Sequence, residues 1–184
     1  MVVIDSKADP GEWAAWGPPR GYVVTRDPND IARHPLVVFQ PDQVDLMDVR
    51  RWRDPQAPWT RALIRTFERG NSVVVFDEAL QTLPSSSPHP IAVKLLTQGR
   101  SRNLSVWAGS QVGNRHETLV ARLAEHCLAF RQLHGQDLAL LREARGIDCG
   151  VLSTLPDWHF AWHRHGLPEW HVFGPVPFVL RRHS

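Results

Sequence analysis

One stretch constrains the fold of this chain more than any other, the run of residues 72–79. Its apolar part reads Val-Val-Val-Phe, and two adjacent carboxylates, Asp77 and Glu78, follow directly. A continuous run of this kind, rich in β-branched residues, is typical of a strand buried on both faces, as in a parallel sheet between helices. Acids that follow such a strand are expected at the carboxyl edge of the sheet, where open α/β folds bind ligands.

The same stretch has the form of a Walker B motif, in which an apolar strand ends in Asp-Glu. In this interpretation Asp77 holds Mg²⁺, directly or through water, and Glu78 orients and activates the attacking water. The competing interpretation is a strand that ends in two solvated acids. The remainder of the sequence has to decide between the two.

Apolar runs alternate with helical patterns along the rest of the chain. We expect strands at residues 1–5, 22–25, 36–40, 72–76, 104–109, 126–130, 158–162 and 170–173. We expect helices at residues 12–16, between Asp27 and Pro35, and at 59–69, 91–97, 116–125 and 136–145. This alternation predicts an α/β fold with a mainly parallel sheet flanked by helices, and a small β-hairpin at the C-terminus. The chain has 184 residues and no internal repeat, so we expect one domain, residues 1–184.

The composition excludes few classes of protein. A net charge of +2 permits contact with nucleic acid but does not argue for it. No stretch approaches the roughly 18 apolar residues of a membrane span, and no signal-peptide pattern is visible. Cys127 and Cys149 form no C-x-x-C pair, so a reduced, cytoplasmic chain is the simplest expectation.

Several short motifs follow one another along most of the chain. They are V-V-I-D-S-K at residues 2–7, V-V-F-D-E-A at 74–79, G-R-S-R-N at 99–103 and V-W-A-G-S-Q at 106–111, followed by A-F-R at 129–131 and L-P at 155–156. In this order they resemble the FtsK–HerA superfamily of ring-forming, DNA-translocating P-loop ATPases. The resemblance implies a RecA-like core that binds ATP and Mg²⁺, forms a homo- or hetero-oligomeric ring and acts on double-stranded DNA.

The resemblance also implies roles for individual residues. Gln111 corresponds to a polar sensor of the γ-phosphate, because its amide can donate and accept hydrogen bonds at once. The alternative for Gln111 is a loop amide that backbone groups satisfy. Asp5 and Lys7 correspond to an early D-x-K motif of the family, which places them near the nucleotide-binding edge.

Arg100 and Arg102 belong to the basic turn at residues 99–103. The family presents cations from this turn to the nucleotide of an adjacent subunit, so either residue is a candidate arginine finger. The sequence does not say which of the two would act. The alternative for both is an exposed or DNA-facing cation.

One motif of the family is absent from these residues. The sequence contains no G-x-x-x-x-G-K-[ST], and thus neither a loop that cradles phosphates nor that loop's lysine. In the family, the loop follows a first strand that lies between the strands corresponding to residues 104–109 and 126–130. Without that strand, both are expected to be buried strands with unpaired backbone groups. We therefore expect a fragment or split subunit, a neighbouring element that fills the gap, or a rearranged fold. Such a chain alone should bind nucleotide weakly and not hydrolyse ATP.

The histidines near the C-terminus suggest a different site. Four of them are close in sequence, namely His159, His163, His165 and His171. They lie on strand-like pieces and could converge on zinc. The competing interpretation is an amphipathic hairpin that packs its tryptophans and leaves the histidines as its polar members.

Two further interpretations concern partners. An Arg-rich surface made by Arg50, Arg51 and Arg53 with Trp52, and by the arginine face of the 59–69 helix, could contact a DNA backbone without reading its sequence. A solvated surface explains the same residues. The chain could also be a non-catalytic scaffold or regulatory subunit of a ring ATPase or DNA-binding assembly.

Overall fold

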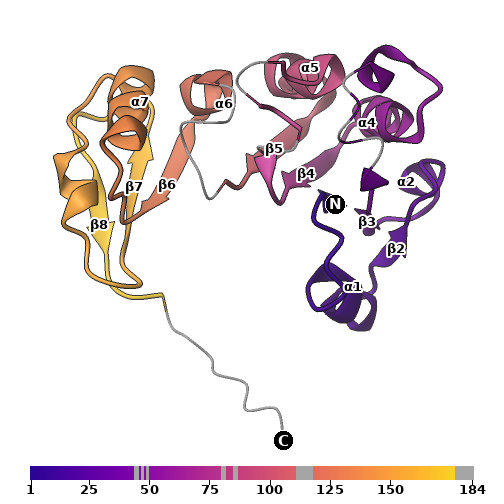
Figure 1. Ribbon diagram of the computed structural model, residues 1–184, viewed down its shortest axis with the longest axis horizontal. Coiled ribbons are helices and arrows are strands. Elements are labelled where there is room, and N and C mark those ends of the chain that lie inside the picture. Colours follow the sequence, from indigo (N-terminus) through magenta and orange to yellow (C-terminus); the bar gives the residue numbers. More distant parts are fainter. Residues whose placement is uncertain are drawn as a thin grey trace, which may run out of the picture. The chain divides into compact units, whose positions relative to one another are not determined.

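The computed structural model describes residues 1–43, 46, 48, 50–79, 82–84, 87–110 and 118–176. The chain divides into two compact units, Met1–Glu117 and Thr118–Ser184, and each is described by itself (Figure 1). Whether the two units act as one domain stays a prediction. In the described part of the chain, no helix has the length and apolarity needed to cross a membrane.

The first unit is built on a five-stranded parallel sheet. Its strands, in the spatial order β2-β3-β1-β4-β5, are β1 (Val2–Ile4), β2 (Val23–Thr25), β3 (Val37–Phe39), β4 (Ser72–Phe76) and β5 (Leu104–Ala108). Its helices are α1 (Trp13–Trp16), α2 (Asp30–Arg33), α4 (Pro58–Arg69) and α5 (Pro90–Gln98), with short 3₁₀ turns at Pro18–Arg20, Arg51–Arg53 and Gly99–Arg102. All neighbouring strands run parallel, so all five strands end at the same edge of the sheet. This architecture confirms the predicted α/β fold.

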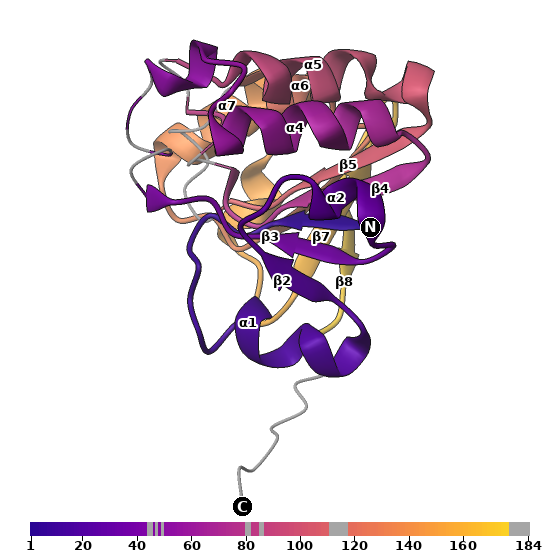
Figure 2. The same cartoon turned by 90° about the vertical axis from the view of Figure 1, so that its right-hand side faces the viewer.

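Different helices cover the two faces of this sheet (Figure 2). The ring of Phe39 stacks on that of Trp59 with centroids 6.3 Å apart, which places α4 on one face. Helices α2 and α5 both contact α4 on this face. The next side chain along β3, Val38, points to the opposite face because successive strand residues alternate. There a Cβ at Gly17, directly after α1, would lie 3.6 Å from Cγ2 of Val38.

On the face of the sheet that carries α1, side chains become more exposed from β3 to β5. One row of register-paired side chains crosses the sheet on this face, Val38, Val3, Val75 and Trp107. Val38 and Val3 are fully buried, Val75 is half-buried and Trp107 is 59% exposed. The prediction that residues 104–109 form a buried strand is therefore wrong for one side of β5, because α1 packs over β3 and leaves that side open.

The second unit is a three-stranded antiparallel sheet with helical segments. Its strands are β6 (His126–Phe130), β7 (Phe160–Arg164) and β8 (His171–Phe173), in that spatial order. Its helices are α6 (Thr118–Leu123) and α7 (Gly135–Arg145), with a 3₁₀ turn at Gly150–Ser153. Strands β7 and β8 confirm the predicted C-terminal hairpin. Helix α7 ends at Gly146, whose φ of 69° is the left-handed conformation favoured by glycine at helix C-termini.

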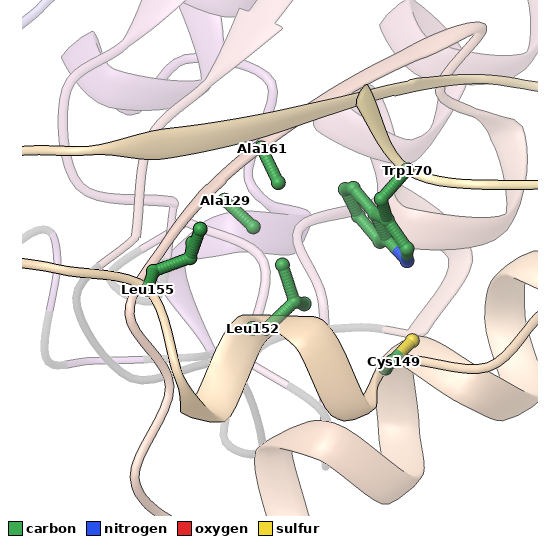
Figure 3. Close-up of a cluster of buried hydrophobic side chains, with 6 residues drawn as sticks. All are labelled: Ala129, Cys149, Leu152, Leu155, Ala161 and Trp170. Atoms are coloured by element: carbon green, nitrogen blue, oxygen red, sulfur yellow. The ribbon is translucent and has the colours of Figure 1, made fainter. Parts of the chain in front are cut away.

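A small apolar core holds this second unit together. Ala129 of β6 and Ala161 of β7 pair across the sheet, and their small side chains leave room for Leu152, Leu155 and Trp170 (Figure 3). The opposite face of the same sheet is more open, and Leu128 and Phe130 are about half exposed there. The core thus lies on one side of this sheet.

Strands β5 and β6 each have a free edge within the described residues, as do β2 and β8 at the other ends of the two sheets. Strand β5 pairs only with β4, and β6 pairs only with β7. Free edges at residues 104–109 and 126–130 agree with the expectation from the missing first strand of the family. The described part of each sheet therefore offers backbone donors and acceptors to a further strand.

Candidate functional site

The carboxyl ends of the central strands place three residues in a row. The backbone N–H groups of Asp5, Asp77 and Gly109 each donate to the carbonyl of the last residue in the neighbouring strand, at 3.0, 3.2 and 2.9 Å respectively. The parallel ladder is thus extended by one residue on β1, β4 and β5. Both acids are therefore held by the sheet itself, at the edge where parallel α/β sheets bind ligands.

Asp5 is fully buried and fixed by neutral donors. Its Oδ2 accepts a hydrogen bond of 2.8 Å from Nε2 of Gln40, and its Oδ1 accepts one of 3.1 Å from the backbone N–H of Ala8. A buried carboxylate needs such donors, because desolvation is otherwise very costly. These bonds hold the Asp5 side chain in one orientation. The position of Asp5 at this edge agrees with the prediction from the D-x-K motif, whereas no motif singled out Gln40.

Asp77 lies beside Lys7 and has an incompletely satisfied carboxylate. The Nζ atom of Lys7 is 3.7 Å from Oδ2 of Asp77, and the two side chains are 30% and 26% exposed. The Oδ2 atom itself is buried and has no hydrogen-bond partner. The D-x-K and D-E motifs, some seventy positions apart in the sequence, thus meet at one edge of the sheet.

A third acid, Glu12, lies close to Asp5 and Asp77. Asp5, Glu12 and Asp77 each offer one oxygen, and these three atoms lie within 4.8 Å of one another. Among the described residues this is the only close group of possible metal ligands. Carboxylate oxygens are the donors that Mg²⁺ prefers, and the unpartnered Oδ2 of Asp77 suits the same ion. The set therefore fits Mg²⁺.

Glu12 was not among the residues that the sequence motifs singled out. This residue directly precedes α1, in the segment that leaves the carboxyl end of β1. An acid in that segment was the available signal, because loops that follow parallel strands gather at the ligand-binding edge. Its proximity to Asp77, however, depends on how the segment folds back.

Glu78 and the loop after β4 are tied to neighbouring strands. Glu78 is 9% exposed, and its backbone carbonyl accepts a hydrogen bond of 3.5 Å from Oγ of Ser6. The N–H of Ala79 donates to the carbonyl of Gly109 at 2.7 Å. A Cβ at Gly109 would lie 3.1 Å from the carbonyl oxygen of Asp77, so glycine permits this close approach. Gln111 lies outside the described residues, and its role as a sensor stays a prediction.

Arg100 and Arg102 lie at the opposite edge of the sheet. Their 3₁₀ turn, Gly99–Arg102, directly precedes β5, so both are at the amino end of the strands. A cleft of about 340 Å³ lies there, between residues 69–71 and 100–103. The Nη2 of Arg102 donates to the carbonyl of Glu68 at 2.7 Å. Within this unit, neither arginine shares an edge with Asp77.

Some arginines of the surface predicted to bind DNA form hydrogen bonds or ion pairs with other residues of the chain. Arg61 donates to Oδ1 of Asn29 at 3.2 Å, and Arg65 forms an ion pair of 3.1 Å with Glu68. Trp52 is only 4% exposed, and its ring centroid lies 5.4 Å from that of His89. The expectation that Trp52 belongs to a contact surface is wrong, because this side chain is buried and packs against the ring of His89.

The histidines near the C-terminus do not converge in the described structure. His163 is fully buried, its Nδ1 accepts from Nε of Arg145 at 3.0 Å, and its Nε2 donates to the carbonyl of Leu167 at 3.0 Å. Both ring nitrogens are therefore in use. The ring of His163 also packs against Trp170, at a centroid distance of 5.3 Å. These contacts favour the amphipathic hairpin over a zinc site.

Comparisons with known proteins find similarity in structure but not in sequence. No family model matches the chain, and no curated protein matches it either. The genome-packaging NTPase B204 of Sulfolobus turreted icosahedral virus 2, in complex with sulfate, superposes with a TM-score of 0.71 at 15% identity. That match covers 96% of this chain and 81% of B204.

Two further structures of B204 match the chain to a similar extent. B204 in complex with ATP-gammaS matches with a TM-score of 0.68 and 15% identity, over 96% of this chain and 82% of that chain. B204 described as the DNA-packaging ATPase of Sulfolobus turreted icosahedral virus matches with a TM-score of 0.67 and 18% identity, over the same shares. At these identities the likeness establishes the fold alone. The chain thus has the α/β architecture of a P-loop NTPase, with a small antiparallel hairpin at its C-terminus.

Proposed function

We propose that this chain is an ATP-binding motor domain of the DNA-translocating type, with both units forming one ATPase domain. Its nucleotide site is the edge where β1 and β4 end. The observation that carries this proposal is Asp77, whose buried Oδ2 has no hydrogen-bond partner and lies in a group of three carboxylates. The similarity in fold to the packaging NTPase B204 in complex with ATP-gammaS supports the choice of ligand.

In this proposal the acids at the carboxyl edge have different roles, namely metal binding and activation of the attacking water. Asp77 holds Mg²⁺, with Asp5 and Glu12 close enough to complete or orient the same site. Bound Mg²⁺ would neutralise charge on the β- and γ-phosphates of ATP. Glu78, next to Asp77, orients the attacking water and accepts its proton, and Gln111 senses the γ-phosphate.

The phosphate-binding loop comes from a further segment or a partner, because no G-x-x-x-x-G-K-[ST] occurs in the sequence. The open edge of β5, the half-buried Val75 and the exposed Trp107 support a place for such a unit. A further strand could pair with the open edge of β5, and a helix after that strand could cover Val75 and Trp107 on the α1 face.

The handedness of the existing connections supports this placement. Connections that move across the sheet toward β5 carry α2, α4 and α5, all on one face. The connection that moves the other way, from β1 to β2, carries α1 on the opposite face. This is the pattern of right-handed crossovers. A strand beside β5 that led into β1 would also move away from β5, so its helix would lie on the α1 face, over Val75 and Trp107.

The amino edge of the sheet has a separate role in the proposal. Arg100 or Arg102 acts as an arginine finger toward the nucleotide of an adjacent subunit in a ring. Their position away from Asp77 is consistent with action on a neighbour and not on the same subunit's nucleotide. Double-stranded DNA would be held through phosphate contacts, so its binding should weaken steeply with added salt.

A binding titration tests the proposed site. A fluorescent ATP analogue, mant-ATP, is titrated into the full chain with Mg²⁺ and, separately, with EDTA. We expect weak binding that needs Mg²⁺ and that falls at least about tenfold in Asp77→Asn, because the variant removes a charged metal ligand. Asp42→Asn is the matched control, since Asp42 is an exposed acid paired with Arg26. Binding that is indifferent to Mg²⁺ and to Asp77→Asn would exclude this site.

The second candidate is a non-catalytic scaffold or regulatory subunit of a ring ATPase or DNA-binding assembly. The absence of a phosphate-binding motif from the sequence favours it. Glu78→Gln in a reconstituted assembly separates the two functions. A catalytic subunit should lose ATP turnover while it keeps nucleotide bound, whereas turnover in an assembly that uses this chain as a scaffold should not change.

A further inference from the structure

The charge balance at the carboxyl edge depends on one lysine. Asp5, Glu12 and Asp77 bring three carboxylates within 4.8 Å of one another, and Lys7 is the cation paired with Asp77. The full sequence has only one other lysine, Lys94, whose Nζ packs 4.5 Å from the ring centroid of Phe67. Without a further cation, the three acids outweigh Lys7 and would repel a polyphosphate.

The ion pair of Lys7 and Asp77 is loose. Its N–O distance of 3.7 Å exceeds a hydrogen bond, and Oδ2 of Asp77 has no hydrogen-bond partner although the atom is buried. Lys7 thus offsets the charge of Asp77 without occupying the coordination position of that oxygen. A buried acceptor left in this way is costly, so a ligand that completes it gains binding free energy.

The backbone around Lys7 is fixed by hydrogen bonds, whereas its side chain is partly exposed and held only by a long ion pair. Asp5 Oδ1 accepts the N–H of Ala8, and the carbonyl of Ser6 accepts from Nε2 of Gln43 at 3.0 Å. The Lys7 side chain is 30% exposed, and a four-carbon stem carries its compact charge. The ammonium can therefore change partner without a change in the fold.

We propose that Lys7 is an exchangeable counter-ion, displaced from Asp77 by a divalent cation and then available to a phosphate oxygen of the bound nucleotide. This inference rests on the proposed magnesium-nucleotide site. Lysine is a common phosphate ligand as a point charge. Lys7 thus gives this chain, which has no phosphate-loop motif, a cation of its own at the nucleotide edge. The cation binds first, because the acids repel the nucleotide until it does.

Two affinities measured on the full chain test the exchange. The first is for Mn²⁺ alone, followed by electron paramagnetic resonance, with Mn²⁺ as an oxygen-preferring substitute for Mg²⁺. The second is for mant-ATP in the presence of Mg²⁺. In Lys7→Met we expect Mn²⁺ to bind about three- to tenfold tighter, because a competing and partly exposed charge is gone. The same variant should bind Mg²⁺–mant-ATP roughly tenfold more weakly, because a phosphate ligand is lost.

The two shifts have opposite signs, which a merely structural role of Lys7 would not produce. Lys94→Met is the matched control and should change neither affinity. Lys7→Arg keeps the charge and should bind Mn²⁺ within about twofold of the wild type, since the counter-ion is retained. This variant also serves if Lys7→Met does not fold, and tighter Mn²⁺ binding by Lys7→Arg would overturn the exchange.

The outcomes separate the two proposals. Mn²⁺ binding by Lys7→Met that is unchanged or weaker, with wild-type binding intact, overturns the counter-ion exchange and leaves the site standing. Nucleotide affinity that is unchanged in Lys7→Met overturns the phosphate contact. A wild-type chain that binds neither Mn²⁺ nor Mg²⁺–mant-ATP overturns the proposed site itself.

Discussion

The two ends of the five-stranded sheet use charge in different ways. At the amino end, arginines donate to backbone carbonyls: Arg69 reaches the carbonyls of Ile31, His34 and Pro35 at 2.8, 3.0 and 3.0 Å, and Arg102 reaches that of Glu68. At the carboxyl end, Asp77 meets Lys7 at 3.7 Å and keeps one oxygen without a hydrogen bond. At the amino end, the arginine side chains satisfy backbone carbonyls near helix and strand ends. At the second end, the fold satisfies both oxygens of Asp5 but leaves one oxygen of Asp77 without a hydrogen bond.

This difference separates structure from function. A polar group that the fold satisfies contributes to stability, and its loss should be measured as a lower free energy of unfolding. A polar group that the fold leaves incomplete is costly, and such violations are expected at functional sites. The carboxyl end is therefore the end at which to look for a ligand. The amino-end arginines have a structural use in this chain, whatever they do for a neighbouring subunit.

The first prediction concerns the pH dependence of stability, which must be kept apart from any effect of the acids at the carboxyl end. Burial lowers the pKa of His89 from 6.5 to about 4. The folded protein favours the neutral ring, whereas the unfolded chain takes up a proton below about pH 6.5. The free energy of unfolding is therefore highest above pH 6.5 and falls by up to about 3 kcal/mol as the pH drops toward 4. Urea unfolding between pH 7 and 4 measures this loss.

A variant assigns that loss to His89. In His89→Gln the loss between pH 6.5 and 4 should shrink by about the same 3 kcal/mol, since the titrating ring is gone. In Asp77→Asn it should persist. If Asp77→Asn and not His89→Gln removed the pH dependence, the acidic end would be a stability element and the comparison of the two ends would fail.

The next effect tests the amino end. Arg69→Met removes three hydrogen bonds to carbonyls and should lower the free energy of unfolding by about 1–3 kcal/mol. Arg65→Met is the matched control in the same helix. Its exposed pair with Glu68 should contribute less than about 1 kcal/mol. Urea unfolding of both variants at pH 7 gives the difference, and equal losses would show that the arginines at this end have no special structural use.

The smallest effect concerns the open side of β5. Trp107 is 59% exposed, so Trp107→Ser should change the free energy of unfolding of the chain alone by no more than about 0.5 kcal/mol. Trp59, which is 1% exposed, is the control, and Trp59→Ala should cost about 3–5 kcal/mol. Chemical denaturation compares the two. A loss above about 2 kcal/mol in Trp107→Ser would mean that this face is covered and is no place for a further helix.

Local patterns predicted much of this molecule. Apolar runs located the strands, because a β-strand buried in a parallel sheet needs little more than β-branched residues. One helix shows the limit of such reasoning. The prediction made Asp27 the cap of this helix and Pro28 its first residue. Oδ1 of Asp27 does accept the N–H of Asn29, but residues 28 and 29 form a turn, and α2 begins only at Asp30.

The site was only partly predictable for a different reason. Asp5, Lys7 and Asp77 follow strands whose parallel pairing brings their ends together, so motif order was enough. Gln40 directly follows β3, and its N–H donates to the carbonyl of Thr25 at 2.9 Å, so its position depends on the strand pairing, as that of Asp5 does. Glu12 reaches the same place through the path of the segment after β1, and no local pattern encodes that path. The exposure of Trp107 depends likewise on which elements cover the sheet, and not on the strand that carries it.

The most direct test of the account is to locate a bound divalent cation. Trace Mn²⁺ is added to the isotope-labelled full chain, and paramagnetic broadening of its backbone amide signals is recorded by NMR. The account predicts that broadening is strongest around Asp5, Lys7 and Asp77, and that Asp77→Asn abolishes it. Strongest broadening at the amino end or in the second unit, or a pattern that Asp77→Asn leaves unchanged, would contradict it.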